Sequence, residues 1–449
     1  MTLAGFVGSS VASLVMDRRS FEDRFVEPIQ ALQLYLKTSG VDDELSKSLN
    51  RRLGVNLCLL GRVQSHLAAE EEELAAISSG RKKKLRRFYS FSSKPSSSSP
   101  KINSALLEEA RRYIKYATAV YGQAMMNAAR VDAKGRIDGK VGRVSKESIS
   151  QHISVPVDGI KLMDVSSIDG DPNILKHMVV TDHENQKVVL SIRGTFSLEE
   201  IILDIDADSR EFCGGEAHSG MATMAERVWA AAGPTVKTEL EANPRYEFIL
   251  TGHSLGAGAA CLVTILVQTQ RLLSKDQKIR CFAYASPPVY TPLEFVPKSV
   301  ESTTNFVHEN DVIPFLSIQK VRKLLSSLRA VDIHARNKLS RKDRYKIILG
   351  ALEPPKDLIA AVLEAEGKKL VPKKGAPTLY IPAEHSVWLK ENIPEEKNGD
   401  ASYRYELSNA REMSQREIRV FPDMLVDHFP ARYEYALDNM EEKPAQDEN

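Results

Sequence analysis

The chain has 449 residues, of which 42% are hydrophobic, so it is long enough for one large or two ordinary domains with a substantial buried core. Its 61 Lys and Arg residues nearly match its 60 Asp and Glu residues, which leaves a formal charge of +1. This balance excludes a global field that would attract nucleic acid or an anionic membrane. We therefore expect no nucleic-acid partner, and any electrostatic targeting has to be local.

Residues 1–79 are expected to form an N-terminal helical region. Its first segment, MTLAGFVGSSVASLVMDRR, lacks the basic start of a signal peptide and is too short for a spanning helix. A packed terminal helix and shallow contact with a bilayer surface are equal alternatives for it. Leucines recur every seven residues from Leu53 to Leu74, which predicts a helix seam that packs against a helix over residues 25–36.

Residues 80–103 are rich in Lys, Arg, Ser and Pro, a composition that cannot bury a core and predicts a flexible linker. Its basic part, residues 81–94, interleaves aromatic residues with cations. Contact with anionic lipid is one interpretation of that part. A nuclear-import signal uses the same residue types, and the sequence does not choose between them.

Residues 104–449 alternate strand-like and helix-like segments, which predicts an α/β sheet with crossover helices. One amphipathic helix is expected over residues 105–126, and others over 225–242 and 254–273. Strands are expected over 177–182, 187–194, 246–252, 279–286 and 302–309. A further strand begins at His385, and a closing helix covers 431–440.

The motif Gly252-His253-Ser254-Leu255-Gly256 lies where a buried strand passes directly into a helix. Such a turn forces the serine into strained backbone and lifts its hydroxyl clear of the sheet. Side chains at Gly252 and Gly256 would collide with the flanking strand and helix. The segment is therefore predicted to be a nucleophile elbow with Ser254 as the nucleophile.

A serine hydroxyl needs a histidine to take its proton and a carboxylate to hold that histidine. In folds with this elbow the chain order is Ser, acid, His, each on a loop after a strand. That order leaves three histidines, and we choose His428 over His334 and His385 because it follows an apolar run and precedes the closing helix. Asp311 is chosen over Asp276 because it follows a predicted strand.

Two backbone amides have to face the oxygen that becomes negative during acyl transfer. One is the amide of Leu255, directly after the nucleophile. The other is expected from Thr195, which follows an early strand, and Gly194 permits the bend there.

These motifs resemble the class 3 lipases and, within that group, the sn-1-specific diacylglycerol lipases. The resemblance covers roughly residues 106–440 and is carried in order by SIRGTFSLEEIILDIDAD, GGEAHSGM, TGHSLGAGAA, CFAYASPPVY, DVIP and MLVDHFPARYEYAL. It implies a fungal-lipase-like α/β-hydrolase fold with a mostly parallel central sheet. It also implies Ser254 as nucleophile, His428 as general base, Asp311 as its orienting acid, and Thr195 and Leu255 as the oxyanion hole.

The same resemblance makes Ser197 to about Asp208 the lid over the site. Within it, four apolar residues share one helical face among carboxylates such as Asp204, and these are Leu198, Ile201, Ile202 and Ile205. An ordinary amphipathic surface helix would show the same pattern. The position after the oxyanion strand favours the lid.

A long insertion, about residues 317–376, separates Asp311 from His428. Its segment 320–346 is strongly basic and helical in pattern. Contact with anionic lipid and a solvated helical cap on the domain are equal alternatives for it.

These observations predict a serine lipase that cleaves an acyl ester of a glycerolipid, with diacylglycerol as the first candidate by resemblance. A phospholipase A1 or a triacylglycerol lipase is the alternative within enzymes. A catalytically inactive lipase-like signalling module and a scaffold that acts through its N-terminal helices are the alternatives outside them. No cofactor is expected, and calcium stimulation rests on family analogy alone. The four cysteines are widely spaced, which indicates reduced thiols in a cytoplasmic protein. Peripheral contact with a membrane or lipid-droplet surface is expected through segments 81–94 and 320–346.

Overall fold

A computed structural model describes residues 53–78, 102–129, 144–165, 174–194, 209–367, 377–392, 402–421, 424 and 426–441. The predictions for residues 1–52, for the basic segment 81–94 and for the segment 195–208 fall outside these described residues. Thr195 and the predicted lid belong to the last of these segments.

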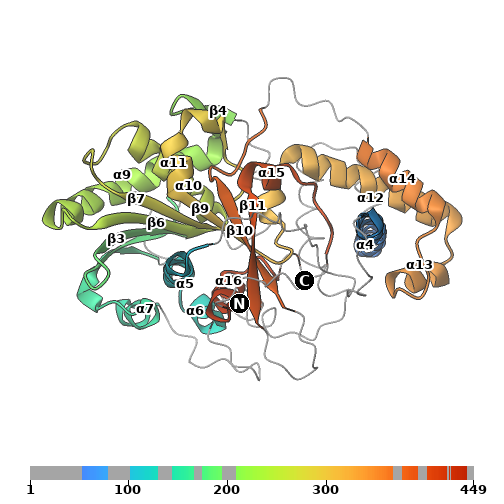
Figure 1. The fold of residues 1–449 in the computed structure, drawn as a ribbon, viewed down its shortest axis with the longest axis horizontal. Helices are drawn as coiled ribbons and strands as arrows, with labels where there is room; N and C mark the ends of the chain where they lie inside the picture. The colour runs from blue at the N-terminus through green and yellow to red at the C-terminus, as the bar shows by residue number, and fades with distance from the viewer. Residues whose placement is uncertain are drawn as a thin grey trace, which may run out of the picture.

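An eight-stranded sheet with the order β1-β2-β3-β6-β7-β9-β10-β11 runs through the molecule (Figure 1). Neighbouring strands are parallel from β3 to β10 and antiparallel at both edges. The predicted α/β fold with a mostly parallel sheet is confirmed. The strands are β1 Ile160–Asp164, β2 His177–Asp182, β3 Lys187–Ile192, β6 Glu247–His253, β7 Ile279–Tyr284, β9 Thr303–His308, β10 His385–Glu391 and β11 Tyr403–Asn409.

Helices cover both faces of this sheet, as expected when parallel strands are joined by crossovers (Figure 1). The first face carries α9 Ser219–Ala242, α10 Leu255–Thr269 and α11 Pro297–Ser302. The second carries α5 Ser104–Ala119, α6 Gln123–Ala129, α7 Lys146–Ile153 and α16 Pro430–Asp438. Each face has its own hydrophobic cluster of fully buried side chains. Both clusters hold the inner strands rigidly, and the ends of these strands carry the candidate site.

The predicted single helix over residues 105–126 is wrong, because the structure divides it into α5 and α6. Gly122 lies between them with a φ of 92°, which is outside the helical region. The end of α5 is closed by the backbone amide of Val120, which donates to the carbonyl of Tyr116, and by the amide of Tyr121, which donates to the carbonyl of Thr118. The apolar spacing continues across the break, which is why the pattern alone indicated one helix.

A second, three-stranded sheet has the order β4-β5-β8 and was not predicted. Its strands are too short for an alternating pattern to identify them, and they are β4 Ser209–Phe212, β5 Gly215–His218 and β8 Tyr290–Thr291. Short connecting elements were also not predicted, and these are the 3₁₀ turns Val157–Gly159, Leu293–Phe295 and Ile313–Phe315 and the helix α15 Ala410–Gln415.

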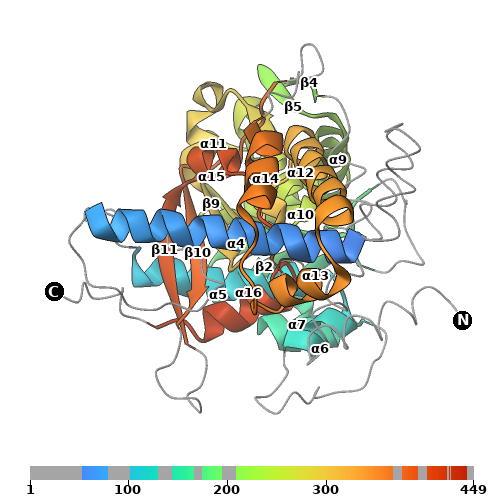
Figure 2. The ribbon, with the colours of Figure 1, turned by 90° about the vertical axis from the view of Figure 1, so that its right-hand side faces the viewer.

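The described part of the insertion, residues 317–367, forms three helices, α12 Ile318–Lys338, α13 Arg341–Ile348 and α14 Lys356–Gly367. The N-terminal helix α4, Leu53–Ser78, crosses all three (Figure 2). Among the described helices, none combines the length and apolarity needed to cross a bilayer.

Polar contacts fix α4 on each helix of the insertion. Asn56 Nδ2 donates to Asp332 Oδ1 of α12 at 3.0 Å. Arg62 Nε donates to the carbonyl of Ile347 in α13 at 3.1 Å, and Gln64 Nε2 donates to Glu366 Oε1 of α14 at 3.1 Å.

The buried apolar side chains of α4 belong to the same cluster as those of α12, and the α4 members are Leu57, Cys58, Leu59, Leu60 and Val63. The leucine seam therefore has the insertion as its partner within the described residues. Its predicted partner, residues 25–36, falls outside them.

Replacing Leu60 by Ala is expected to lower the free energy of unfolding by about 2–5 kcal/mol, because the fully buried side chain leaves a cavity between α4 and the insertion. Urea unfolding monitored by circular dichroism measures the change. Leu349→Ala is the matched control, since Leu349 is 79% exposed. Equal stability of the two variants would contradict a structural role for the α4 contact.

Candidate active site

Ser254 occupies the turn between β6 and α10 with a φ of 62° and a ψ of −130°. A positive φ is costly for a residue other than glycine, so the surroundings have to impose it. A Cβ on Gly252 would lie 2.8 Å from the Ile192 carbonyl oxygen, and one on Gly256 would lie 2.7 Å from the Gly194 nitrogen. The glycines thus let α10 approach the end of β3, and the backbone amide of Ser254 donates to the Tyr284 carbonyl at 2.9 Å.

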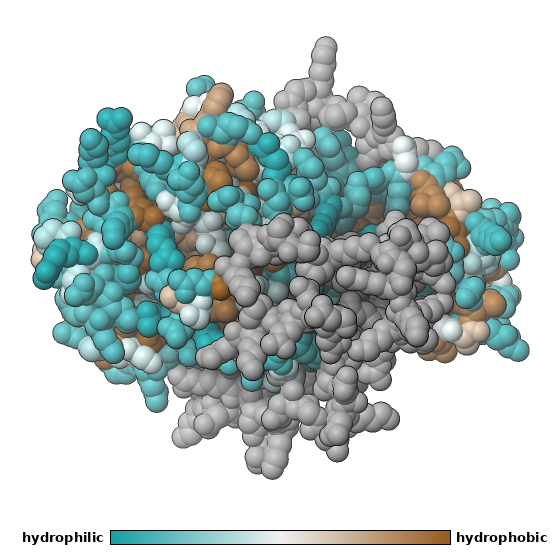
Figure 3. Space-filling model, viewed as in Figure 1, coloured by the Kyte–Doolittle hydropathy of each residue, from teal (hydrophilic) through white to brown (hydrophobic). Residues whose placement is uncertain are grey.

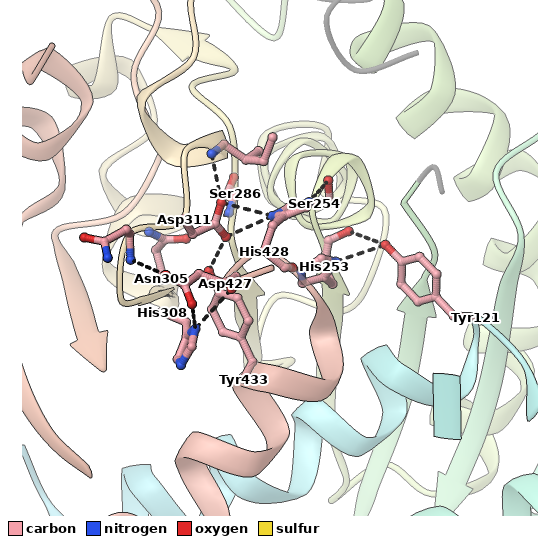
Figure 4. Close-up of polar contacts among 12 residues, drawn as sticks. Tyr121, His253, Ser254, Ser286, Asn305, His308, Asp311, Asp427, His428 and Tyr433 are labelled. Atoms are coloured by element: carbon pink, nitrogen blue, oxygen red, sulfur yellow. Dashed lines mark hydrogen bonds and ion pairs between the residues drawn. The ribbon is translucent and has the colours of Figure 1, made fainter. Parts of the chain in front are cut away.

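His428 lies between Ser254 and Asp311 (Figure 4). Its Nε2 is 3.0 Å from Ser254 Oγ, and its Nδ1 is 2.9 Å from Asp311 Oδ2 and 3.1 Å from Oδ1. The histidine precedes α16, and the aspartate follows β9, so separate elements deliver the two side chains. The structure therefore brings together the three residues chosen from the sequence.

The two histidines not chosen lie in other contacts. His334 is in α12, with its Nε2 3.4 Å from Asp357 Oδ1. His385 begins β10, and its Nδ1 is 3.8 Å from Glu384 Oε2. Neither pairs with Asp311.

The Asp311 carboxylate is fully buried and accepts hydrogen bonds from several donors. Besides His428, the amide of Ile313 donates to Oδ1 at 2.9 Å, and the Tyr433 hydroxyl donates to Oδ2 at 2.5 Å. Burial, and then the adjacent Asp311 charge, raise the pKa of Tyr433 well above its usual value, so the hydroxyl remains a donor. Sequence reasoning missed Tyr433, although its place in the first turns of the closing helix put it near His428.

The loops that carry the acid and the base are joined by their neighbouring residues. The amide of Asn310 donates to Asp427 Oδ2 at 3.1 Å. His308 Nδ1 lies 3.1 Å from the carbonyl oxygen of Asp427, which only accepts, so this nitrogen carries the proton. Burial lowers the pKa of His308 to about 3, and the ring is therefore neutral. These contacts fix the separation of Asp311 from His428 through the backbone.

A second buried chain of hydrogen bonds joins the end of β3 to the His428 backbone. The Gly194 amide donates to the Tyr121 hydroxyl oxygen at 3.2 Å, and that hydroxyl lies 3.0 Å from His253 Nδ1. His253 Nε2 lies 2.6 Å from the His428 carbonyl oxygen and must donate to it. Burial, and then the neighbouring His428, lower the pKa of His253 well below its usual value. His253 is thus neutral, Nδ1 accepts, and Tyr121 donates to it.

Ser254 sits at the N-terminus of α10, where the first amides lack intrahelical acceptors and the helix dipole favours negative charge. The Leu255 amide is the first of these. Gly194, the residue before Thr195, lies close to the serine, since a Cβ there would be 3.0 Å from Ser254 Cβ. The side chain of Ser254 is itself fully buried in this arrangement.

Across the described part of the chain, no three His, Cys, Asp or Glu side chains gather in a way that could hold a metal ion. The site chemistry described here is that of a hydroxyl, an imidazole and a carboxylate. Such a set transfers acyl groups through a serine nucleophile.

Comparison with known proteins identifies the region around this site. Residues 189–321 match the family model described as lipase (class 3). Diacylglycerol lipase-beta of Mus musculus is 26% identical over 305 residues, which cover 59% of this chain and 44% of that protein. Diacylglycerol lipase-alpha of Homo sapiens is 28% identical over 188 residues, covering 38% of this chain and 17% of that protein. The resemblance to class 3 lipases and to diacylglycerol lipases that the motifs indicated is confirmed.

Lipase II from Rhizopus niveus is similar in structure, with 21% identity, coverage of 49% of this chain and 78% of that one, and a TM-score of 0.38. The chain spans less than half the length of the two diacylglycerol lipases that it matches.

The pKa of His308 gives a pH-dependent prediction. The unfolded chain binds a proton at His308 below about pH 6.5, whereas the folded protein does so only near pH 3. The contribution of neutral His308 to the free energy of unfolding is therefore fully present above pH 6.5, the pKa in the unfolded chain. It is lost as the pH falls toward 3, by up to about 1.4 kcal/mol per pH unit.

His308→Asn keeps a side-chain donor for the Asp427 carbonyl but does not titrate, so its free energy of unfolding should fall less steeply between pH 6 and 4. Urea unfolding across this range measures the slope. His183→Asn, at an exposed position, is the control and should keep the wild-type slope. Parallel curves for wild type and His308→Asn would contradict a buried, neutral His308.

Proposed function

Residues 189–321 match the class 3 lipase family, and on this premise we propose that the chain is a serine lipase that hydrolyses an acyl ester of a glycerolipid. The observation that carries the proposal is the relay from Ser254 through His428 to Asp311, with contacts of 3.0 and 2.9 Å. Its position at a strained strand-to-helix turn is the one that this chemistry requires.

In the proposed reaction, Ser254 Oγ attacks the ester carbonyl carbon while His428 Nε2 takes the hydroxyl proton. Asp311 accepts a hydrogen bond from the Nδ1–H group of His428 throughout, stays ionised, and stabilises the imidazolium that forms. The negative oxygen of the tetrahedral intermediate faces the amides of Leu255 and Thr195. His428 then gives the proton to the leaving glycerol oxygen, which leaves an acyl-enzyme. Water, deprotonated by His428, attacks this ester, and the fatty acid leaves as Ser254 regains its proton.

The proposed substrate is diacylglycerol, cleaved at the sn-1 position. Support for it comes from the names of the two similar proteins, both diacylglycerol lipases. A phospholipid or a triacylglycerol presents the same type of ester, so the substrate has to be identified by its products.

Access to the serine requires movement, because Ser254 is 0% exposed. We propose that the segment 197–208 supplies the cover, as its apolar face and its place after the oxyanion strand predict. Opening at a lipid surface would expose the serine where the substrate lies.

Membrane contact is proposed at α13 and the turn that follows it, and not along the whole insertion. Cations of α12 are engaged within the protein, as Lys323 Nζ lies 2.6 Å from Glu417 Oε1 and Lys338 Nζ lies 2.9 Å from Asp357 Oδ2. Arg336 Nε likewise lies 3.1 Å from Asp332 Oδ2. Their charges are partly compensated, so α12 is a weak ligand for anionic lipid.

The end of α13 combines exposed cations with exposed apolar residues. Tyr345 is 53%, Leu349 79% and Leu352 41% exposed, and Lys342 and Lys346 are exposed beside them. Figure 3 shows apolar surface among hydrophilic residues at the end of the molecule formed by α13 and α14. Basic side chains beside apolar ones are suited to the headgroup boundary of an anionic bilayer. This α13 tip, residues 341–352, would hold the protein peripherally on a membrane.

Ser254→Ala is expected to lower hydrolysis of 1-stearoyl-2-arachidonoyl-glycerol vesicles by at least about 10³-fold, because no other group replaces the nucleophile. Mass spectrometry of the products identifies which acyl chain is lost. Ser326→Ala, in α12, is the matched control and should retain wild-type turnover. Loss of the sn-1 chain with wild type and control only would support both the reaction and the substrate.

The same three proteins are then tested on phospholipid and triacylglycerol. Serine-dependent turnover of one of these instead would replace diacylglycerol as the substrate and keep the lipase. Equal background products from wild type and Ser254→Ala on every ester would contradict the proposed function and favour a catalytically inactive module.

Lys342→Gln and Lys346→Gln are each expected to weaken partitioning onto phosphatidylserine-containing vesicles roughly fivefold, since each removes an exposed cation near the surface. Vesicle co-sedimentation measures it. Lys338→Gln is the control, because Lys338 is paired with Asp357. A larger loss with Lys338→Gln than with the α13 variants would place the contact elsewhere.

A further inference from the structure

A cavity of ≈ 390 Å³ lies against the loop that carries Asp311. Its volume is within the range of small-molecule sites. Neither Ser254 nor His428 lines it, so it is separate from the nucleophile. Its lining residues are Asn310, Val312, Phe315, Trp388, Arg416, Glu417, Arg419 and Phe421.

The cavity combines apolar walls with cationic groups. The Arg416 guanidinium lies 5.1 Å from the centroid of the Trp388 ring, and Arg419 is a second cationic lining residue. The one acidic lining residue, Glu417, is already paired with Lys323 at 2.6 Å. Because Glu417 is exposed, the cavity reaches the protein surface there. A ligand in the cavity would therefore meet two guanidinium groups, those of Arg416 and Arg419, together with aromatic rings.

We propose that this cavity binds a single-chain anionic amphiphile, with its head group at Arg416 and Arg419 and its chain against Phe315, Trp388 and Phe421. Guanidinium groups bind carboxylates and phosphates through paired hydrogen bonds, and the aromatic walls remove the chain from water. Burial lowers the pKa of Arg416, so an adjacent anion would stabilise its charged form.

An occupant would act on the acid of the triad. Asn310 and Val312, which flank Asp311, both line the cavity. The Trp388 indole Nε1 donates to the carbonyl of Glu309 at 2.7 Å, so the cavity wall also holds the turn before Asp311. A chain inserted here displaces that loop and lengthens the 2.9 Å contact between Asp311 and His428. Turnover falls as a result.

The fatty acid released in the proposed reaction belongs to this ligand class. The regulatory half of the inference, inhibition by the product at a second site, therefore rests on the proposed function. The binding half does not, since it depends only on the cavity.

Binding is tested by tryptophan fluorescence. The chain has two tryptophans, Trp229 and Trp388, so Trp229→Phe leaves the cavity residue as the only one. Oleate brominated across its double bond is titrated in, and saturable quenching of Trp388 is expected. Arg416→Gln and Arg419→Gln, made in this background, should each raise the Kd roughly tenfold or more.

Arg411→Gln is the matched control, because Arg411 lies in α15 near the cavity but pairs with Glu294. Its Kd should equal that of the Trp229→Phe background. If a glutamine variant unfolds, Arg419→Lys replaces it, and loss of the paired geometry should still weaken binding. Absence of quenching, or one Kd for all variants, overturns the proposal.

Two further probes define the head group. The brominated methyl ester has no charge and should bind at least tenfold more weakly than the acid, whereas equal binding overturns the anionic specificity. Brominated oleoyl lysophosphatidate presents a phosphate on the same chain. The probe with the lower Kd shows whether the cavity prefers the carboxylate of a free fatty acid or the phosphate of a lipid head group. Either preference supports an anion site.

Regulation is tested on a soluble short-chain ester with and without added oleate. Oleate should lower kcat of wild type about tenfold at saturation and should leave kcat of the Arg416→Gln, Arg419→Gln double variant unchanged. Oleate that competes with the ester at the active site would raise KM, and this rise should occur in both the wild type and the double variant. An equal fall in kcat in both overturns the regulatory half. If the wild type hydrolyses no ester, the proposed function fails, while the quenching experiment still decides the cavity.

Discussion

The turn between β6 and α10 leaves no room for side chains at Gly252 and Gly256, and the rest of the site depends on this close approach. It brings the N-terminus of α10 against the end of β3 and forces Ser254 to a φ of 62°. The strain persists because strands on both sides and helices on both faces are closely packed around the turn. The nucleophile thus obtains its position from the hydrophobic core and not from its own side-chain contacts.

Neutral, buried histidines hold the loops around this turn. His253 joins Tyr121 to the His428 backbone, and His308 joins the loop of Asp311 to Asp427. Burial lowers the pKa of both rings, which keeps each as one donor and one acceptor at neutral pH. A protonated ring would have no acceptor nitrogen, so His253 could no longer accept from Tyr121. The uncharged rings of His253 and His308 therefore provide directional hydrogen bonds, whereas the ring of His428 is placed to exchange a proton with Ser254.

The parts of the site set by local chain chemistry were predictable, and the parts set by tertiary packing were not. The glycines around Ser254 identify the strand-to-helix turn within five residues. The predicted strand before Asp311 places that residue at the carboxyl ends of the parallel strands, where Ser254 also lies. Tyr433 and Tyr121 carry no such local signal, because their roles arise only when α16 and the turn between α5 and α6 pack beside the sheet. Helix α4 shows the same distinction: its apolar seam was evident, but several buried surfaces could have matched it. The break at Gly122 was hidden because the apolar spacing continues through it.

The contact of α4 with the insertion changes where a boundary can be drawn in this chain. Helix α4 precedes the α/β region in sequence, yet a Cβ on Gly61 would lie 2.8 Å from the carbonyl oxygen of Val420, and Gln64 Oε1 accepts from the Val420 amide at 2.9 Å. Val420 belongs to the segment that leads to His428. Helix α4, the insertion and the segment that leads to His428 therefore pack against one another. A shortened chain that begins at residue 104 would leave in water the apolar side of α12 that packs against α4, so this packing needs more of the chain than residues 106–440, which carry the lipase-like motifs.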